Sequence, residues 1–592
     1  MIDTRGRRGA AAILTACALA LAGAAGAQAA PPLPFGHACA PKAGVLFCPS
    51  ATLDQRIPSF DGTPMDVDVT LPATGDGPFP LVVVMHGYGG DKTSAQSSGP
   101  STGLDDVGLA GRGYAVVTLS ARGFGMSCGK AASRTPDCDK AGWIHLADQR
   151  FEGRDTQELI GKLVDEKVVD PLAIGVAGGS YGGGQALELA FLRDRIRLPD
   201  GSYAPWKSPN GTPLRIAAAA PNIPWADLAA ALVPNGRFTD DQTWNARRER
   251  TPVGVPIKSY VNGLYASGNA AGWVAPIGSD PQADLAGWRQ LFIDQGEPYG
   301  ADAAAVGKQM QEYHSALAIP GEPAPLLISN GWTDDLFPAP HALRAYNTIR
   351  ARNAKAPVSL VLGAFGHPRG GTGEPATGNA LLAEEVAFFG AYLKGTGTPP
   401  KAGSVTAALT TCPKGKRAPI YHASSWAAIA RKVDSFFLAR TQTVKSSGGD
   451  PALGQAFDPV GAKVDPCTEI AAEKPAGSAI IDGPIRSTVT QIGPTEIRAT
   501  VAARGRDGQL AGRLWDVDPK SGKMRLADRG VYRLTPDQKG KVRFQLHGNG
   551  RRWLKGHIAR LELSGSDAGY LRPSNTAFSV KVSRMTLALP VR

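Results

Sequence analysis

The sequence lacks several features that would assign it to a large class of proteins. Beyond the N-terminal segment it has no run of 18 apolar residues, so we expect no membrane-spanning helix there. It has no C-x-x-C pair, which argues against a structural zinc site, and nothing in it implies a cofactor. Its net charge is +12, but the lysines and arginines are dispersed, so we expect no nucleic-acid partner. No internal repeat is found.

The composition is that of a folded protein of several domains. Of the 592 residues, 43% are apolar and 20% are charged, whereas disorder requires low hydrophobicity and high charge. At roughly 100–200 residues per domain, this length predicts two to four domains.

The N-terminus has the pattern of a signal peptide, which we place at residues 1–29. Three arginines precede an apolar stretch over residues 10–25, and Ala27-Gln28-Ala29 forms an A-x-A cleavage site. We therefore expect an exported protein, either secreted or held in the periplasm or cell envelope. As an alternative, residues 14–17 are similar to a lipobox, which would make Cys17 a lipidated N-terminus.

Seven cysteines are present, and six remain if Cys17 leaves with the signal peptide. An even number suits an oxidising compartment, although six cysteines allow fifteen pairings. Short loops bring partners together at low entropic cost. Local spacing therefore favours three disulfides: Cys39–Cys48, Cys128–Cys138 and Cys412–Cys467.

Strand-like and helix-like segments alternate from about residue 66 to residue 397. This alternation of strands and helices predicts a mostly parallel sheet with helices on both faces. We place it in a catalytic α/β domain at residues 30–400. Residues 66–71 alternate polar and apolar side chains, which is typical of an edge strand. The other strands are expected at 81–85, 114–119, 172–177, 216–220, 325–329 and 359–362, and the helices at 154–168, 181–192, 339–352 and 381–393.

Two segments interrupt or end this rhythm. Residues 225–315 are rich in Trp, Asn, Gly and Pro and predict a helical cap over the active edge of the sheet. A Gly/Pro-rich linker at residues 395–404 precedes alternating segments separated by turn residues. Residues 401–592 are therefore expected to form a β-sandwich.

Residues 178–182 (GGSYG) fit the G-x-S-x-G pattern of a nucleophile elbow. They lie between a predicted buried strand and a predicted helix, which is the context that this motif requires. The glycines permit a sharp, strained turn that presents Ser180 at the helix N-terminus, where backbone N–H groups stabilise an anion. We therefore identify Ser180 as a candidate nucleophile. The alternative is a glycine-rich turn that only permits close packing.

A serine hydroxyl needs a base, and in this fold an acid and then a histidine follow the serine along the chain. Of nine histidines, His367 lies in a loop directly after the strand at 359–362. The strand at 325–329 runs into Asp334 and Asp335, and either could orient the histidine. The other aspartate would then cap the following helix.

The oxyanion of an acyl-transfer intermediate also needs hydrogen-bond donors. The backbone N–H of Tyr181, one residue after the nucleophile, is the first expected donor. The second is expected from the loop at residues 86–92 (HGYGGDK), in which we assign His86 a structural role.

Taken together, these motifs resemble those of the X-Pro dipeptidyl-peptidase and cocaine-esterase-like serine hydrolases. The resemblance rests on residues 179–183 (GSYGG), 331–334 (GWTD) and 366–367 (GH), and on 120–129, which is similar to the family's RG-x-G-x-S-x-G stretch. Residues 512–519 and 571–575 are similar to parts of the family's non-catalytic jelly roll.

The resemblance implies three assignments. It selects Asp334 over Asp335, because the family's acid closes a G-W-x-D motif. It implies that the phenol of Tyr88 donates to the oxyanion, although Tyr88 here lies in HGYGGDK and not in the family's P-Y-x-K form. It also assigns a helical cap to residues 225–315. The family's acidic residues that recognise an amino terminus cannot be placed on this cap.

We therefore predict a secreted serine hydrolase that cleaves a peptide or ester bond. The X-Pro dipeptidyl-peptidase type is the first interpretation, and a carboxylic ester or amide hydrolase is the alternative. A different class, an envelope glycan-binding protein with a vestigial hydrolase domain, is disfavoured by the intact serine, aspartate and histidine set.

Overall fold

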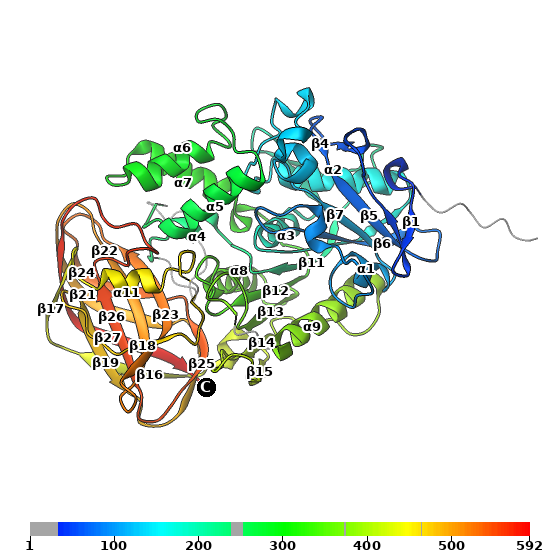
Figure 1. The fold of residues 1–592 in the computed structure, drawn as a ribbon. Helices are drawn as coiled ribbons and strands as arrows, with labels where there is room; N and C mark the ends of the chain where they lie inside the picture. The colour runs from blue at the N-terminus through cyan, green and yellow to red at the C-terminus, as the bar shows by residue number, and fades with distance from the viewer. Residues whose placement is uncertain (1–32, 238–252, 372–374, 463) are drawn as a thin grey trace, which may run out of the picture.

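The computed structural model describes residues 33–237, 253–371, 375–462 and 464–592. The predicted signal peptide and Cys17 lie outside these ranges. Within them, no helix is both long enough and apolar enough to cross a lipid bilayer. Figure 1 shows a sheet flanked by helices, a group of helices above its left-hand end, and a second β-rich unit at the lower left.

The first sheet has eleven strands and is parallel from β7 to β14, with antiparallel strands at both ends. In spatial order the strands are β1 (Ala40–Lys42), β2 (Val45–Cys48), β5 (Val67–Pro72), β7 (Ala115–Leu119), β6 (Phe79–Met85), β8 (Val169–Gly179), β11 (Ile216–Asn222), β12 (Leu326–Gly331), β13 (Val358–Gly363), β14 (Val405–Ala408) and β15 (Ile420–Ala423).

Helices cover both faces of this sheet, as the alternation of segments predicted. Along β6, Leu81, Val83 and Met85 pack into the core on one face, while Val82 and Val84 pack into the core on the other. Successive side chains of a strand point to opposite faces, so a strand buried on both faces is apolar throughout. The first face carries α2 (Glu152–Asp165), α3 (Tyr181–Leu192) and α8 (Ala339–Arg352), and the second carries α1 (Asp106–Ala110) and α9 (Pro375–Lys394).

Two features of the sheet differ from expectation. The strand at residues 66–71 is not an edge strand, because the β1–β2 hairpin pairs outside β5 and every residue of β5 is buried. At the other end, β14 and β15 extend the sheet beyond residue 400, where the domain boundary was expected. The Gly/Pro-rich stretch at 395–404 therefore connects α9 to the next strand of the same sheet.

The predicted cap is helical in its described part. Its helices are α4 (Leu228–Leu232), α5 (Lys258–Ala271), α6 (Leu285–Arg289), a π-helical turn (Gln290–Gln295) and α7 (Ala301–Tyr313). Their apolar faces share a core with Tyr181 and Phe124 of the first domain and with Tyr570 of the second β unit. The cap is thus packed on both neighbours.

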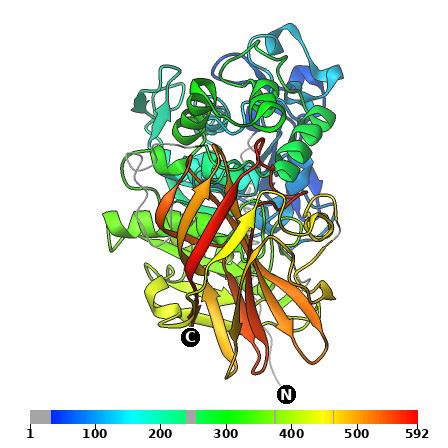
Figure 2. The same cartoon turned by 90° about the vertical axis from the view of Figure 1, so that its left-hand side faces the viewer.

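The second β unit is the expected sandwich, and its two antiparallel layers are visible in Figure 2. One sheet contains β16 (Lys432–Leu438), β17 (Gln442–Lys445), β20 (Val489–Gly493), β21 (Glu496–Arg504), β24 (Lys539–Gln545), β25 (Asn549–Trp553) and β27 (Ser579–Val591). The other contains β18 (Glu469–Ala471), β19 (Ala479–Pro484), β22 (Gln509–Asp518), β23 (Lys523–Arg533) and β26 (Ile558–Ser564). Alternate residues of the two sheets, such as Val501 and Leu514, meet in one core.

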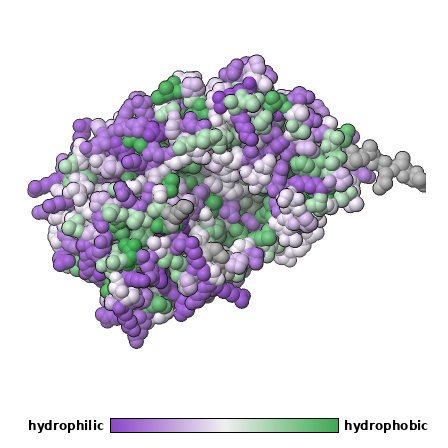
Figure 3. Space-filling model, in the orientation of Figure 1, coloured by the Kyte–Doolittle hydropathy of each residue, from purple (hydrophilic) through white to green (hydrophobic). Residues whose placement is uncertain are grey.

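The remaining β-strands and α-helices of the described residues are short. They are β3 (Ile57–Pro58), β4 (Pro64–Met65), β9 (Arg195–Arg197), β10 (Tyr203–Pro205), α10 (Trp426–Ile429) and α11 (Pro451–Ala456). On the face seen in Figure 3, hydrophilic residues predominate over the sandwich and are interspersed with apolar ones.

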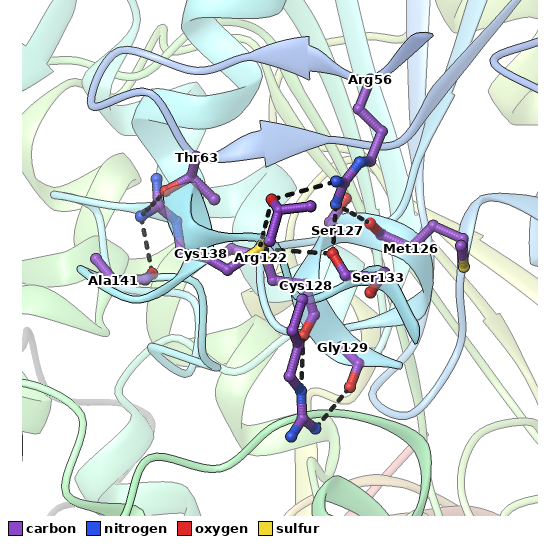
Figure 4. Close-up of a disulfide and its surroundings, with 12 residues drawn as sticks. Arg56, Thr63, Arg122, Met126, Ser127, Cys128, Gly129, Ser133, Cys138 and Ala141 are labelled. Atoms are coloured by element: carbon purple, nitrogen blue, oxygen red, sulfur yellow. Dashed lines mark hydrogen bonds between the residues drawn. A yellow bond between two sulfur atoms is a disulfide. The ribbon is translucent and has the colours of Figure 1, made fainter. Parts of the chain in front are cut away.

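The three disulfides expected from local spacing are all present: Cys39–Cys48, Cys128–Cys138 and Cys412–Cys467. Such bonds persist in oxidising compartments. Figure 4 shows how buried arginines fix the loop around the second of them. Arg56 donates to the carbonyls of Met126 and Ser133 at 3.0 and 2.7 Å, and Arg122 donates to the carbonyl of Ala141 at 3.0 Å.

Candidate active site

Ser180 lies at the turn between the end of β8 and the start of α3, where the motif placed it. Its φ of 56° and ψ of −113° are strained for a residue with a side chain. A Cβ atom on Gly182 would lie 2.2 Å from the carbonyl oxygen of Met85, and one on Gly183 would lie 2.2 Å from that of Asn222. The turn therefore needs glycine at both positions.

The structure brings His367 and Asp334 to Ser180 in series. Ser180 Oγ lies 2.7 Å from His367 Nε2, and His367 Nδ1 lies 2.7 Å from Asp334 Oδ2. His367 follows β13 and Asp334 follows β12, so adjacent parallel strands deliver both side chains to the same edge of the sheet. With Nδ1 protonated and donating to the carboxylate, Nε2 is free to accept the serine proton.

Asp334 is fully buried and held by four hydrogen bonds. Its Oδ1 accepts from the backbone N–H groups of Leu336 and Phe337, each at 2.9 Å, and its Oδ2 accepts from the backbone and imidazole nitrogens of His367. Gly366 has a φ of 122°, and a Cβ there would lie 2.5 Å from Asp334 Oδ2. Glycine before the histidine therefore lets the two loops approach.

Aromatic rings surround the imidazole and reduce its contact with solvent. Phe337 meets His367 edge to face with ring centroids 5.3 Å apart, and Tyr260 of α5 does so at 6.4 Å. The His367 side chain is 15% exposed. The cap helix α5 thus contacts the candidate base directly, a contact that no sequence pattern indicated.

The expectation that the second aspartate caps the following helix is wrong. Helix α8 begins at Ala339 after Pro338, and Asp335 is instead fully buried among guanidinium groups. Arg369 pairs with its carboxylate through two hydrogen bonds of 2.7 Å, and Arg529 of the sandwich donates to it at 3.2 Å. No local pattern indicates these contacts, because Arg529 is 194 positions away.

Tyr181 and Tyr88, the residues expected to donate to the oxyanion, have side-chain rings in contact. Tyr181 is the first residue of α3, so its backbone N–H has no acceptor within the helix. The Tyr88 ring meets the Tyr181 ring edge to face with centroids 5.4 Å apart, and its hydroxyl points toward Gly268 of α5. Burial raises the pKa of the Tyr88 phenol, which therefore stays protonated and able to donate.

The side chain of Tyr181 is fixed on the far side of the turn. Its hydroxyl donates to Glu152 Oε1 at 3.0 Å and accepts from the backbone N–H of Ala147 at 3.0 Å. Burial raises the pKa of the Tyr181 phenol, and the nearby Glu152 raises it further. Glu152 also accepts from the backbone of His145 and Asp148. This network holds the residue that follows Ser180.

Three other histidines have hydrogen-bond partners other than Ser180. His86 accepts from the backbone N–H of Ala121 through Nε2 at 2.9 Å, so its Nδ1 donates to the carbonyl of Gly87, which is the expected structural role. His341 is buried in α8, and its pKa is well below the usual value because of burial. His422 lies in β15, where its Nδ1 is 3.1 Å from Thr406 Oγ1.

A cavity beside the candidate oxyanion site lies between the cap helices and Tyr88. It has a volume of about 70 Å³, is partly open to solvent and is lined mainly by apolar side chains. Among the described lining residues, only Arg289 is charged, and it pairs with Asp294 at 2.8 Å. The lining includes Tyr88, Leu146, Leu232, Leu264, Leu285, Trp288 and Phe292.

Comparison with known proteins agrees with the resemblance read from the motifs. Residues 61–195 match the X-Pro dipeptidyl-peptidase (S15 family). This stretch contains Tyr88, Ser180 and Tyr181. No curated protein matches the sequence.

Solved structures share the fold over nearly the whole chain. A CocE/NonD family hydrolase from Staphylococcus aureus is 14% identical, with a TM-score of 0.57, covering 93% of this chain and 94% of its own. An aminopeptidase from a marine sediment archaeon, Thaumarchaeota archaeon, is 14% identical, with a TM-score of 0.60 and coverage of 93% and 98%. An alpha-amino acid ester hydrolase is 14% identical, with a TM-score of 0.57 and coverage of 93% and 97%.

At these identities the structural likeness establishes the fold, while the family match covers the segment around Ser180. The chain therefore resembles the X-Pro dipeptidyl-peptidases by sequence over residues 61–195 and the CocE/NonD hydrolases by fold over 93% of its length, as its motifs predicted.

Proposed function

We propose that this protein is an exported serine hydrolase that cleaves an acyl bond, peptide or ester, through an acyl-enzyme on Ser180. The observation that carries the proposal is the series of two 2.7 Å contacts from Ser180 Oγ to His367 and from His367 to Asp334. The match to the S15 family supports a hydrolase.

Acylation begins when Ser180 Oγ attacks the substrate carbonyl carbon and its proton moves to His367 Nε2. Asp334 stabilises the imidazolium and keeps its orientation. The carbonyl oxygen becomes an oxyanion, which accepts hydrogen bonds from the Tyr181 N–H and the Tyr88 hydroxyl. The tetrahedral intermediate then expels the amine or alcohol, which takes the proton from His367.

Deacylation repeats these steps with water as the nucleophile. His367 Nε2 takes a proton from the water as its oxygen attacks the acyl carbon, and the proton then passes to Ser180 Oγ as the ester bond breaks. The acid is released and the free serine is restored. Neither half-reaction requires an oxidant or a reductant.

Two substrate classes fit this chemistry, an Xaa-Pro peptide and a carboxylic ester. A dipeptidyl-peptidase must bind a protonated amino terminus, for which a nearby carboxylate is the natural partner. The described lining of the cap cavity instead offers apolar side chains and the cation Arg289. This observation favours an ester or amide with an apolar, uncharged acyl group.

A substrate panel tests the proposal. We expect 4-nitrophenyl esters with acyl chains of four to eight carbons to be turned over faster than Xaa-Pro anilides, and S180A to reduce the rate by about 10⁴-fold or more. If S180A retains the full rate, the nucleophile is wrong. If anilides are cleaved and esters are not, the peptidase interpretation holds instead.

A variant of the cavity separates the two substrate classes further. Leu264 lies on α5 in the cavity lining, and Leu264→Trp would fill part of the space. We expect kcat/KM to fall for the octanoyl ester and to stay within about twofold for the acetyl ester, which does not need the cavity. If kcat/KM falls equally for both esters, the acyl group binds outside this cavity.

A further inference from the structure

The carboxylate of Asp335 joins the loops that carry Asp334 and His367 to the sandwich. It accepts two hydrogen bonds from Arg369, which lies two residues after His367, and one from Arg529 of β23. Asp335 and Arg529 have no exposed surface, and Arg369 is 3% exposed. The two loops are thus linked by the Asp335–Arg369 ion pair as well as by the hydrogen bond between Asp334 and His367.

The sandwich holds Arg529 in turn. Its Nη2 donates to Asp567 at 2.9 Å and its Nη1 to the carbonyl of Phe457 at 3.0 Å, while the guanidinium carbon lies 4.1 Å from the centroid of the Tyr570 ring. The Tyr570 hydroxyl donates to the backbone carbonyl of Asp335 at 2.7 Å. Asp335 is therefore held through both its side chain and its main chain.

The series of buried charges continues into the sandwich. Arg513 donates to Asp567 at 3.3 Å and forms two hydrogen bonds, of 3.0 and 2.8 Å, with Glu562. The indole of Trp515 also donates to Glu562, at 3.0 Å. Each charge thus has a partner of opposite sign, as the removal of so many ions from water requires.

The acid loop also contacts β14 of its own sheet and β25 of the sandwich. Trp332, three residues before Asp335, is fully buried and donates to the carbonyl of Ala408 at 2.8 Å. A Cβ on Gly550 of β25 would lie 2.5 Å from its indole nitrogen. The sandwich therefore packs closely on both sides of Asp334.

Stability alone is a poor explanation for this arrangement. Replacing a buried ion pair with apolar residues is often neutral or stabilising, because desolvation offsets the Coulomb attraction. Burial alone would raise the pKa of Asp335, but Arg369 and Arg529 hold it well below its ordinary range. The carboxylate therefore remains charged, and its directional bonds remain in place, across the neutral range.

We infer that Arg529 and Tyr570 are positioning residues for the hydrolytic reaction, so that the sandwich fixes the geometry of the candidate acid and base. Arg529 and Tyr570 hold Asp335 by hydrogen bonds. Asp335 in turn fixes the position of Asp334 through the backbone and that of His367 through Arg369. The inference rests on the proposed function. It makes the sandwich part of the catalytic machinery and not only a cover beside it.

The expected effect follows from the sensitivity of proton transfer to geometry. A displacement of about 1 Å in a catalytic group can reduce the rate about 100-fold. Loss of Arg529 should let the acid loop shift and lengthen the contact between Asp334 and His367. Substrate binding in the cap cavity should change little, so kcat should fall while KM stays nearly constant.

Three variants test the inference in the full chain. Arg529→Met removes the charge but retains much of the volume, and we expect kcat for 4-nitrophenyl butanoate to fall by about 10- to 100-fold. Arg529→Lys keeps a cation that can reach one carboxylate oxygen, and it should recover part of the loss. Tyr570→Phe removes only one hydroxyl and disturbs folding less than the loss of a buried charge. It should lower kcat roughly threefold.

The sandwich offers a matched control at its edge. Arg560 of β26 is 7% exposed and forms two hydrogen bonds with Asp482 of β19, the strand at the edge of the same sheet. Arg560→Met should lower the melting temperature but leave kcat unchanged well below that temperature. Circular dichroism would confirm that each variant is folded at the assay temperature.

A spectroscopic readout keeps the test independent of turnover. The proton shared by His367 Nδ1 and Asp334 should give a downfield NMR resonance that shifts or broadens in Arg529→Met and stays unchanged in Arg560→Met. If Arg529→Met and Tyr570→Phe retain wild-type kcat and this resonance, the inference is overturned. If the wild type turns over neither esters nor Xaa-Pro anilides, the proposed function fails, and the resonance alone decides the inference.

Discussion

Asp334 and Asp335 are consecutive residues whose carboxylates serve different partners. Asp334 Oδ2 lies 2.7 Å from the His367 imidazole, while Asp335 forms two 2.7 Å hydrogen bonds with Arg369. Both pairs join the loop after β12 to the loop after β13. The Asp334–His367 pair contains an imidazole that must gain and lose a proton during the reaction. The Asp335–Arg369 pair contains only groups that remain charged.

Replacement of Asp334, the candidate acid, should greatly reduce activity. We expect Asp334→Asn to lower kcat by about 10³- to 10⁴-fold, because the neutral amide no longer stabilises the imidazolium or selects the tautomer. Steady-state kinetics with a 4-nitrophenyl ester would measure the loss. The control is Asp280→Asn, since Asp280 also contacts a histidine, which is His145 and not His367. A loss of less than tenfold in Asp334→Asn would reject Asp334 as the acid.

The hydroxyl of Tyr88 is the oxyanion donor that the family resemblance implied. We expect Tyr88→Phe to lower kcat by about 10²-fold with little change in KM, because the donor acts on charge that develops in the transition state. Tyr265→Phe is the matched control, since Tyr265 lines the same cavity. Equal kinetics for the wild type and Tyr88→Phe would leave the backbone N–H of Tyr181 as the assigned donor.

The glycines of the elbow should differ sharply in their tolerance of a methyl group. A Cβ on Gly182 would meet the carbonyl oxygen of Met85, whereas one on Gly179 has nothing within 4 Å. Gly182→Ala should therefore destabilise the fold by about 3 kcal/mol or more, while Gly179→Ala should cost less than about 1 kcal/mol. Urea denaturation of the two variants measures the difference. Similar midpoints would contradict the close approach of α3 to β6.

Much of the site was predictable because its signals are local. The strand, the glycine turn and the helix around Ser180 are consecutive in the chain, and residues 181–192 form the expected helix. The rule that parallel strands end at one edge of a sheet indicated His367 and either Asp334 or Asp335, and the family resemblance selected Asp334. The three disulfides were also predictable from spacing.

Other features depend on contacts that no local pattern encodes. The β1–β2 hairpin covers β5 because residues near 45 pair with residues near 70, although β5 alternates like an edge strand. The pairing of Asp335 with Arg529 joins two domains, and the contact of Tyr260 with His367 depends on how the cap folds back. These relationships are set by tertiary packing.

Glu385 should make stability depend on pH. It is buried in α9, and burial, followed by the charge of Glu384, raises its pKa from 4.5 to about 8. Between these values the folded chain holds a proton that the unfolded chain does not, so stability falls as pH rises from 4.5 to 8. Glu385→Gln removes this fall and should stabilise the protein by about 1–3 kcal/mol at pH 8 and much less at pH 5.

Denaturant unfolding at the two pH values measures this effect. The surface substitution Glu158→Gln serves as the control, because Glu158 is partly exposed and pairs with Lys162 on α2. Its effect should be small and similar at both pH values. If Glu385→Gln changes the free energy of unfolding by the same amount at pH 5 and at pH 8, the carboxyl of Glu385 titrates normally.

The central claim is that Ser180 is a nucleophile activated by His367, and covalent labelling tests it most directly. A fluorophosphonate probe should label the folded wild type at a single residue, identified as Ser180 by peptide mass spectrometry. His367→Ala should slow labelling by about 10³-fold or more, because the serine loses its base. Failure of the folded wild type to label, or labelling at another residue, would contradict the account and would favour a binding function for this fold.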